Sequence, residues 1–171
     1  MEWLNQIREK IVDRSDLHAV LDPIRKSGLS IAFTNGCFDI LHKGHVEYLA
    51  QAADLADVLV LGLNSDDSVR RLEKGDDRPV NSQDARAAVL SALGFIDVIV
   101  IFDEDTPEQL IKEVHPNVLI KGADYDPQEA DPSSKKYVVG RESVLAAGGE
   151  VKVIDLVPGF STTNIVNKLK K

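Results

Sequence analysis

The sequence predicts an α/β protein built on a doubly wound parallel sheet of five strands, with a helical extension before the first strand. Five short apolar runs alternate with helical patterns, which is typical of parallel strands joined by right-handed crossovers. The run that follows Asp57, up to Leu63, is apolar, as in a strand buried on both faces. A glycine turn separates the first strand from the next helix, in the layout of a phosphate-binding loop.

The elements follow from periodicity and from cap residues. Residues 2–28 predict two short helices with apolar stripes, so we divide the chain into a helical extension, 1–29, and a main domain, 30–171. The expected strands are 30–34, 57–63, 97–102, 117–121 and 151–156. The expected helices cover about 40–55, then 68–73, 82–93 with Asn81 or Ser82 as cap, a segment from Thr106-Pro107, 140–147 and 158–171. The polar loop 126–136 is the expected mobile segment.

Composition limits the class of protein. The chain has 171 residues, of which 43% are hydrophobic and 28% are charged, as in one globular domain. Its net charge of −8 argues against a general nucleic-acid binder. The single cysteine, Cys37, cannot form an internal disulfide, which fits a reducing compartment. Because no run reaches membrane-spanning length and no signal-peptide pattern opens the chain, we expect a cytoplasmic protein without a membrane partner.

The stretch 33–45 is expected to carry the chemistry. A helical pattern begins there near Ile40, and His42 and His45 are three positions apart. Their imidazoles can therefore point at one spot above the first helical turn. Free backbone N–H groups and the positive end of the helix dipole converge at the same place. Gly44 lies between the histidines, and its missing side chain would let a nucleotide approach the backbone closely.

Further candidates follow the carboxyl ends of strands, where doubly wound sheets bind ligands. The nucleotide-binding candidates are Asn35, Gly36, Cys37, Phe38, Gly44, Asn64, Gly122, Asp124, Ser161, Thr162 and Thr163. The hydroxyl groups at 161–163 open the last helix, where they either cap it or hold phosphate oxygens. A cap-and-turn role is the alternative for Gly122 and Asp124. We expect Cys37 to be a small packing residue and not a nucleophile, because no histidine–acid pair is evident around it.

Two motifs resemble those of a known family. The first is Gly-x-Phe-Asp-x-x-His-x-Gly-His, over 36–45, and the second is Ser-Thr-Thr-x-Ile, over 161–165. Together they resemble the signatures of the cytidylyltransferase-like nucleotidyltransferases, which implies a Rossmann-like nucleotidyltransferase fold. The sequence is most similar to the adenylyltransferase domain of the ADP-heptose synthases, in the segments 33–42, 78–81, 105–107, 121–125 and 159–165. In their two-domain form a sugar kinase precedes this domain. Here we expect a standalone domain that depends on another protein for its sugar 1-phosphate.

The resemblance implies a reaction, the transfer of AMP from ATP to D-glycero-D-manno-heptose 1-phosphate. The alternative is a cytidylyltransferase acting on an alcohol phosphate such as glycerol 3-phosphate. Relatives with that activity carry Arg-Thr-Glu before Gly-Ile-Ser-Thr, whereas this chain has Leu-Val-Pro-Gly-Phe at 156–160. An alternative of another class is a nucleotide-binding regulatory module that lacks turnover.

The resemblance also implies roles for individual residues. His42 and His45 would hydrogen-bond the α-phosphate and its bridging oxygen, and Lys74 would contact the triphosphate, unless it is only a solvated lysine. The acceptor-binding candidates are Arg78, Arg86, Lys121 and Arg141, with a structural ion pair as an equal alternative for Arg86. Mg²⁺ would accompany ATP on phosphate oxygens and water, because the sequence has no compact carboxylate cluster for a protein-bound metal. The apolar stripes of the first helices make a homodimer the expected assembly.

Overall fold

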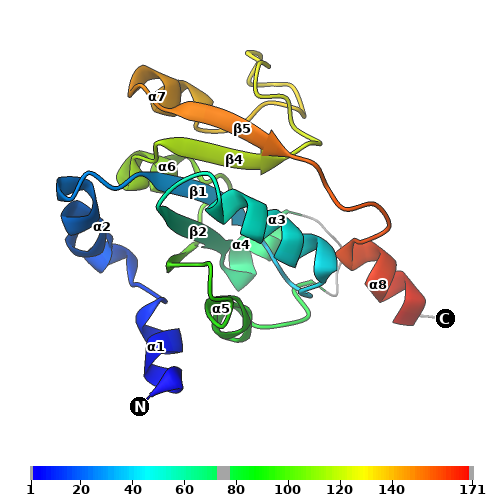
Figure 1. Cartoon of the computed structure of the whole chain (residues 1–171). Helices are drawn as coiled ribbons and strands as arrows, with labels where there is room; N and C mark the ends of the chain where they lie inside the picture. The colour runs from blue at the N-terminus through cyan, green and yellow to red at the C-terminus, as the bar shows by residue number, and fades with distance from the viewer. Residues whose placement is uncertain (1, 73–77, 170–171) are drawn as a thin grey trace.

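The computed structural model describes residues 2–72 and 78–169, and its centre is a parallel five-stranded sheet (Figure 1). The strands are β1 (Ile31–Gly36), β2 (Val58–Asn64), β3 (Val98–Phe102), β4 (Val118–Gly122) and β5 (Glu150–Ile154). Their order is β3-β2-β1-β4-β5, and every neighbouring pair is parallel. The chain winds outward in both directions from β1, so the predicted doubly wound sheet is confirmed. The gap between the carboxyl ends of β1 and β4 is its switch point.

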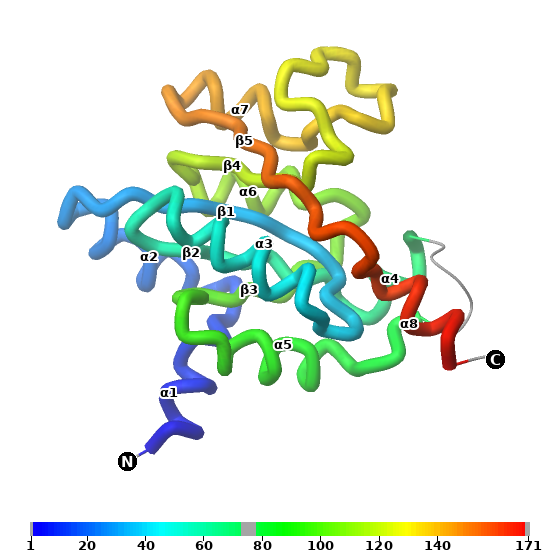
Figure 2. Tube along the Cα trace, turned by 45° about the vertical axis from the view of Figure 1, so that its right-hand side comes forward, coloured from blue at the N-terminus to red at the C-terminus, as the bar shows by residue number. Residues whose placement is uncertain are grey.

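Hydrophobic cores lie on both faces of the sheet because successive strand residues point to opposite sides. Ile31 and Phe33 of β1 belong to one core, whereas Ala32 belongs to the other. The first core is covered by α2 (Leu17–Lys26), α6 (Glu108–Val114) and α7 (Arg141–Ala146). The second is covered by α3 (Lys43–Ala53) and α5 (Gln83–Ser91), as Figure 2 illustrates. This layering leaves the loops at the carboxyl ends of the strands free to build a site.

The N-terminal segment packs onto the sheet. It contains α1 (Trp3–Glu9), a 3-10 turn η1 (Arg14–Asp16) and α2, three short elements where the sequence predicts two. Leu17 and Leu21 are fully buried in the first core. Ile11 forms a parallel bridge with Ile99 of β3. Residues 11–26 therefore contribute to the same fold as the sheet.

Several helices begin at residues other than the predicted ones because of their caps. α3 begins at Lys43 and not near Ile40, since His42 is extended (φ −145°, ψ 169°). α4 (Asp66–Arg71) begins two residues earlier than predicted, because Ser65 accepts a hydrogen bond from the Ser68 N–H. Ser82 is the cap of α5, which decides between the two predicted candidates. α8 (Thr162–Leu169) begins only after the chain turns through Gly159 at φ +83°. Within the described ranges, no helix has the length and apolar character of a membrane span.

Candidate active site

The two histidines meet at the first turn of α3. His42 is the N-cap of this helix, and its Nδ1 accepts a hydrogen bond from the His45 N–H at 3.3 Å. The two rings stack with centroids 3.8 Å apart and planes 14° from parallel. The sequence predicts this convergence from helical spacing, but the structure achieves it differently. His42 precedes the helix, and its cap bond folds the ring over the ring of His45.

Both imidazoles favour the neutral form. Burial is the main reason that the pKa of His45 falls from 6.5 to about 4, and the charges of His42 and Arg78 lower it further. A backbone hydrogen bond with Ile40 opposes this shift. Burial also lowers the pKa of His42. At neutral pH each ring therefore presents one N–H donor and one acceptor nitrogen, and neither carries a positive charge.

The glycines of the first motif lie close against protein side chains. Phe38 has a left-handed backbone (φ 43°) and its ring contacts His45 edge-on at 5.1 Å. A Cβ atom on Gly36 would lie 2.9 Å from the Phe38 ring. A Cβ atom on Gly44 would lie 3.1 Å from the His42 ring and 3.2 Å from the Phe160 Cβ. In the direction of a side chain at 44, His42 and Phe160 are therefore the neighbours, and close approach of a nucleotide to the Gly44 backbone stays a prediction.

Asp39 organises the loop that follows β1, a role that the sequence interpretation missed. Its carboxylate is buried and accepts hydrogen bonds from the backbone N–H groups of Val80 and Asn81, at 2.9–3.0 Å. It also accepts a charged hydrogen bond from Nε of Arg78. This pairing holds Arg78 near His45, whose pKa the Arg78 charge lowers. The available signal was an acid inside the first motif together with a distant Arg-Pro-Val-Asn segment.

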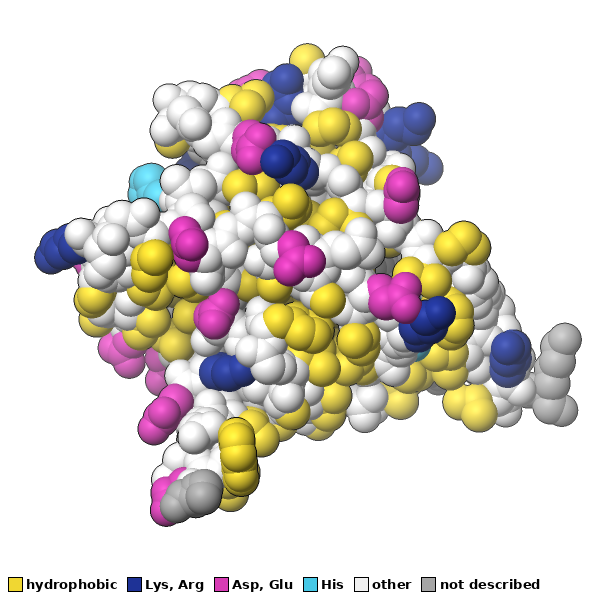
Figure 3. All heavy atoms as spheres, in the orientation of Figure 1, with side chains coloured by type: hydrophobic (Ala, Val, Ile, Leu, Met, Phe, Trp, Pro, Cys, Tyr) yellow, Lys and Arg dark blue, Asp and Glu magenta, His cyan; other side chains and the backbone are white. Residues whose placement is uncertain are grey.

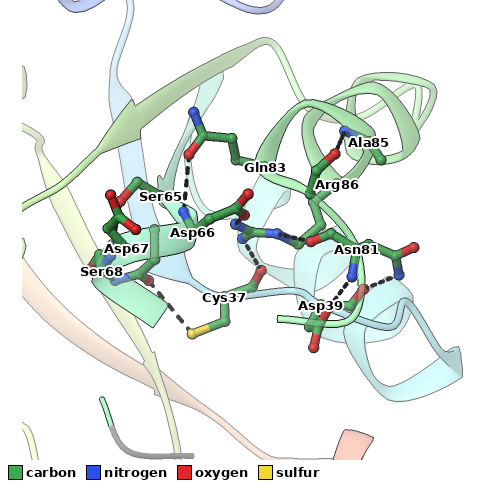
Figure 4. Close-up of polar contacts among 12 residues, drawn as sticks. Cys37, Asp39, Ser65, Asp66, Asp67, Ser68, Asn81, Gln83, Ala85 and Arg86 are labelled. Carbon is green, nitrogen blue, oxygen red and sulfur yellow. Dashed lines mark hydrogen bonds and ion pairs between the residues drawn. The ribbon is translucent and has the colours of Figure 1, made fainter. Parts of the chain in front are cut away.

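Arg86 links three segments and is buried too deeply to meet an acceptor. Its guanidinium donates to the carbonyls of Cys37 at 2.6 Å and Asn81 at 3.1 Å (Figure 4). It also forms an ion pair with Asp66 at 2.8 Å. The side chain of Arg86 has no exposed surface. The prediction of acceptor binding is therefore corrected to its stated alternative, a structural ion pair, because burial leaves no path to a ligand.

Asn64 and Cys37 also lie below the surface. Nδ2 of Asn64 donates to the Ser68 hydroxyl at 2.9 Å, which joins the end of β2 to α4. Sγ of Cys37 lies 3.9 Å from Oδ1 of the same amide. Both residues are less than 8% exposed. Asn64 therefore makes a structural hydrogen bond and Cys37 is packed below the surface, while nucleotide binding by either residue stays a prediction.

The switch point holds a buried lysine. Nζ of Lys121, at the end of β4, donates to Oδ1 of Asn35 on β1 and lies 5.5 Å from the Tyr125 ring centroid. Oδ1 of Asp124 lies 2.7 Å from the place of a Cβ atom on Gly122. Any side chain at 122 would displace this carboxylate, which gives the glycine a steric reason. The predicted strand-end candidates Asn35, Lys121, Gly122 and Asp124 are therefore brought together.

The second motif lies beside the first in space. Ser161 caps α8, since its hydroxyl accepts a hydrogen bond from the Asn164 N–H at 3.1 Å, and Thr162 and Thr163 form the first turn. The neighbouring Phe160 ring lies 6.3 Å from the ring of His42. The cap role left open for Ser161 is thus present in the structure. The N-terminal ends of α3 and α8 consequently face one region (Figure 1).

One predicted residue, Arg141, lies apart from this group. Nε of Arg141 donates to the carbonyl of Pro127 at 2.9 Å, which places this side chain against the loop 126–136. Lys74 lies outside the described residues. In the parts of the chain that the structure describes, no group of three or more His, Cys, Asp or Glu side chains has the geometry of a metal site. Among the described charged residues, Arg78 lowers the pKa of His45 by its charge, and Lys43 lies over the Phe160 ring beside His42.

Comparison with known proteins identifies the family. Residues 33–168, which include both motifs, match the cytidylyltransferase-like family. The chain belongs to this family. The match supports the predicted class of enzyme, a nucleotidyltransferase, and the Rossmann-like sheet agrees with it.

Curated members related to this cytidylyltransferase-like chain include the bifunctional protein HldE of Syntrophotalea carbinolica, 51% identical over 160 residues, or 94% of this chain and 31% of the relative. The bifunctional protein HldE of Campylobacter fetus subsp. fetus is 56% identical over 147 residues, or 86% of this chain and 29% of the relative. The chain thus spans about a third of the length of these relatives.

Two solved structures are similar to this cytidylyltransferase-like chain. The lipopolysaccharide core biosynthesis protein of Thermoplasma volcanium is 28% identical with a TM-score of 0.57, and the match covers 76% of this chain and 98% of the other. The pantoate-beta-alanine ligase of Francisella tularensis has a TM-score of 0.60 at 15% identity, with coverage of 94% and 76%. At that identity the second likeness concerns the fold alone.

Proposed function

We propose that the chain transfers AMP from ATP to a sugar 1-phosphate, D-glycero-D-manno-heptose 1-phosphate, giving ADP-heptose and pyrophosphate. The observation that carries this proposal is the pair of stacked, neutral imidazoles at the N-terminal end of α3, with the N-terminal end of α8 beside them. The choice of adenine and heptose rests on the identity of about half of the residues with HldE proteins.

The reaction forms one P–O bond and breaks another. A phosphate oxygen of the acceptor attacks the α-phosphorus of ATP, and the bond from that phosphorus to the α,β-bridging oxygen breaks, so that pyrophosphate leaves with the electron pair. Little covalent chemistry is required of the protein, so alignment and charge stabilisation supply most of the rate. Neutral His42 and His45 would donate N–H hydrogen bonds to the α-phosphate and the bridging oxygen as negative charge develops there.

The remaining groups would hold the phosphates. Lys121 and Arg78, which is paired with Asp39, are proposed to contact phosphate oxygens, and Lys74 is proposed as a further triphosphate contact. The N–H groups at 161–163 would bind the outer phosphates. Lys121 and Arg78 are the acceptor-side candidates, and Asp124 would meet the nucleoside.

Mg²⁺ is proposed to enter bound to ATP, where it would neutralise the charge of the pyrophosphate group. The stacked imidazoles and the N-terminal end of α3 would then contact the phosphate oxygens that carry the ion. Mg²⁺ keeps several waters and commonly binds through substrate phosphates, so a cage of protein carboxylates is not needed.

The direct experiment is an assay of the purified chain with ATP and heptose 1-phosphate, with the product identified by phosphorus NMR. ADP-heptose with equimolar pyrophosphate is the expected result. A parallel reaction with CTP and glycerol 3-phosphate tests the alternative activity. If the chain bound nucleotide tightly but formed no product with either pair of substrates, it would be a regulatory nucleotide-binding module and not an enzyme.

The histidine mechanism has its own test. His45→Ala should lower kcat by about 10²–10³-fold, which is typical of removing one donor to a developing oxyanion. The matched control is His115→Ala, which removes an exposed imidazole at the C-terminal end of α6. If His45→Ala kept its turnover within a few-fold of wild type, the catalytic role of the pair would be wrong.

A homodimer is part of the proposal for assembly. Trp3 and Leu4 of α1 are 73% and 57% exposed, which leaves an apolar surface at the N-terminal end. Light scattering on the purified chain measures its mass directly. A monomer at micromolar concentration, unchanged by Trp3→Ser, would remove the dimer from the proposal.

A further inference from the structure

Phe160 lies where the N-terminal ends of α3 and α8 meet. Its ring centroid is 6.3 Å from that of His42, with 35° between the planes. Its Cβ is 3.2 Å from the place of a Cβ atom on Gly44. Nζ of Lys43 lies 5.6 Å from the centroid of the same ring, within the range of a cation–π contact. One aromatic side chain of the C-terminal segment thus covers three consecutive residues of the first motif.

The rest of α8 is only partly covered, with Ile165 and Val166 half-buried. No residue of this helix is buried. Leu169 at its far end is 79% exposed, whereas Phe160 is 45% exposed. In both the ribbon and the tube view, α8 extends away from the body of the fold beyond its first turn (Figures 1 and 2). Hydrophobic side chains are visible on the surface over this helix in Figure 3. The Phe160 ring joins the beginning of this helix to the first motif.

We propose that Phe160 is a positioning residue, which docks the N-terminal end of α8 on the His42 face of α3 so that both helix openings act on one triphosphate. The inference rests on the proposed function and deepens it. Ser161 follows Phe160 directly and caps α8, so a shift of the aromatic ring moves the N–H groups at 161–163 with it. Gly44 belongs to the same contact, because a Cβ atom there would push His42 and Phe160 outward by a few tenths of an ångström.

The physical reason for such a device is preorganisation. Aligning phosphate groups is most of what this class of reaction asks of the protein, and a displacement of about 1 Å can cost about 10²-fold in rate. The backbone N–H groups of α8 are useful only if they are held at a fixed distance from the imidazoles. An apolar contact that does not involve the phosphates can hold these N–H groups in place without competing for the ligand.

The test compares Phe160→Ala with Phe160→Leu, which keeps apolar bulk over His42. The matched control is Leu169→Ala, a truncation at the opposite end of the same helix. The first readout needs no ligand: hydrogen exchange of the α8 amides, including the Ile165 N–H that donates to the Ser161 carbonyl at 3.2 Å. We expect exchange at least tenfold faster in Phe160→Ala, within threefold of wild type in Phe160→Leu, and unchanged in Leu169→Ala.

The second readout is kinetic and separates positioning from general stability. In Phe160→Ala the KM for ATP should rise about tenfold and kcat should fall, while the melting temperature stays within about 2 °C of wild type because the ring is already half exposed. Phe160→Leu should recover most of the loss. Gly44→Ala should reproduce the defect, and the double variant with Phe160→Ala should be less impaired than the product of the two single effects.

The outcomes are distinct. Wild-type exchange of α8 in Phe160→Ala would overturn the inference, and so would a loss of thermal stability with unchanged KM and kcat. Faster exchange in Phe160→Ala, in a chain that transfers no nucleotide from ATP or CTP, would support the docking contact and refute the proposed function instead.

Discussion

The protonation of His45 should make the stability of the protein depend on pH in a way that one substitution removes. The pKa of this imidazole is about 4 in the fold, against 6.5 for an exposed histidine, and burial is the main cause. Between these two values the unfolded chain binds a proton that the folded chain does not. Stability contributed by neutral His45 is therefore present above the unfolded pKa and is lost as the pH falls toward the folded pKa.

The magnitude follows from the two pKa values. For a single site with these constants, the free energy of unfolding falls by about 2 kcal/mol between about pH 7.5 and pH 5. His45→Gln keeps the backbone N–H that donates to His42 but cannot take up a proton. The variant should therefore lose about 2 kcal/mol less than wild type over this interval, whatever its stability at pH 7.5.

The assay is urea unfolding at several pH values for wild type, His45→Gln and the control His115→Gln. The His115 side chain is exposed and lies outside the pair. An NMR titration of the His45 ring checks the same pKa directly. Parallel stability curves for wild type and His45→Gln, or a midpoint near the ordinary histidine value, would refute the burial argument and with it the neutral state assigned to the pair.

Two further predictions concern buried polar groups. Arg86→Met should lower the free energy of unfolding by about 3–5 kcal/mol in urea, because Asp66 and two backbone carbonyls lose their buried partner. Arg70→Met breaks an exposed ion pair and should cost less than about 1 kcal/mol. Equal losses in the two variants would contradict the structural role of Arg86. Tyr48→Phe should cost about 1–2 kcal/mol, because the Tyr48 hydroxyl shares a buried 2.7 Å hydrogen bond with that of Thr34; an unchanged urea midpoint would mean that water or another group satisfies Thr34.

The fold class and much of the site can be read from local patterns. Alternating apolar runs and helical segments are enough to specify a doubly wound sheet, because few other arrangements bury such strands on both faces. The carboxyl ends of parallel strands lie at one edge, so Asn35, Lys121 and Asp124 are predicted near one another from their positions after strands. The spacing of His42 and His45 likewise predicts that their rings meet.

Long-range partners are what the sequence alone leaves undecided. The guanidinium of Arg86 has the chemistry to bind a phosphate. Only the packing of α5 against the Cys37 loop shows that this guanidinium forms an ion pair with Asp66. Asp39 has no local partner, and its role depends on a segment about 40 residues away.

The sequence by itself determined the strands and the pair of histidines, since each depends on interactions within a few residues along the chain. The tertiary structure decided which charges are neutralised inside the fold and which face the site, because burial and pairing are properties of neighbours in space. It also decided that Phe160, from the end of the chain, lies over His42 and Gly44.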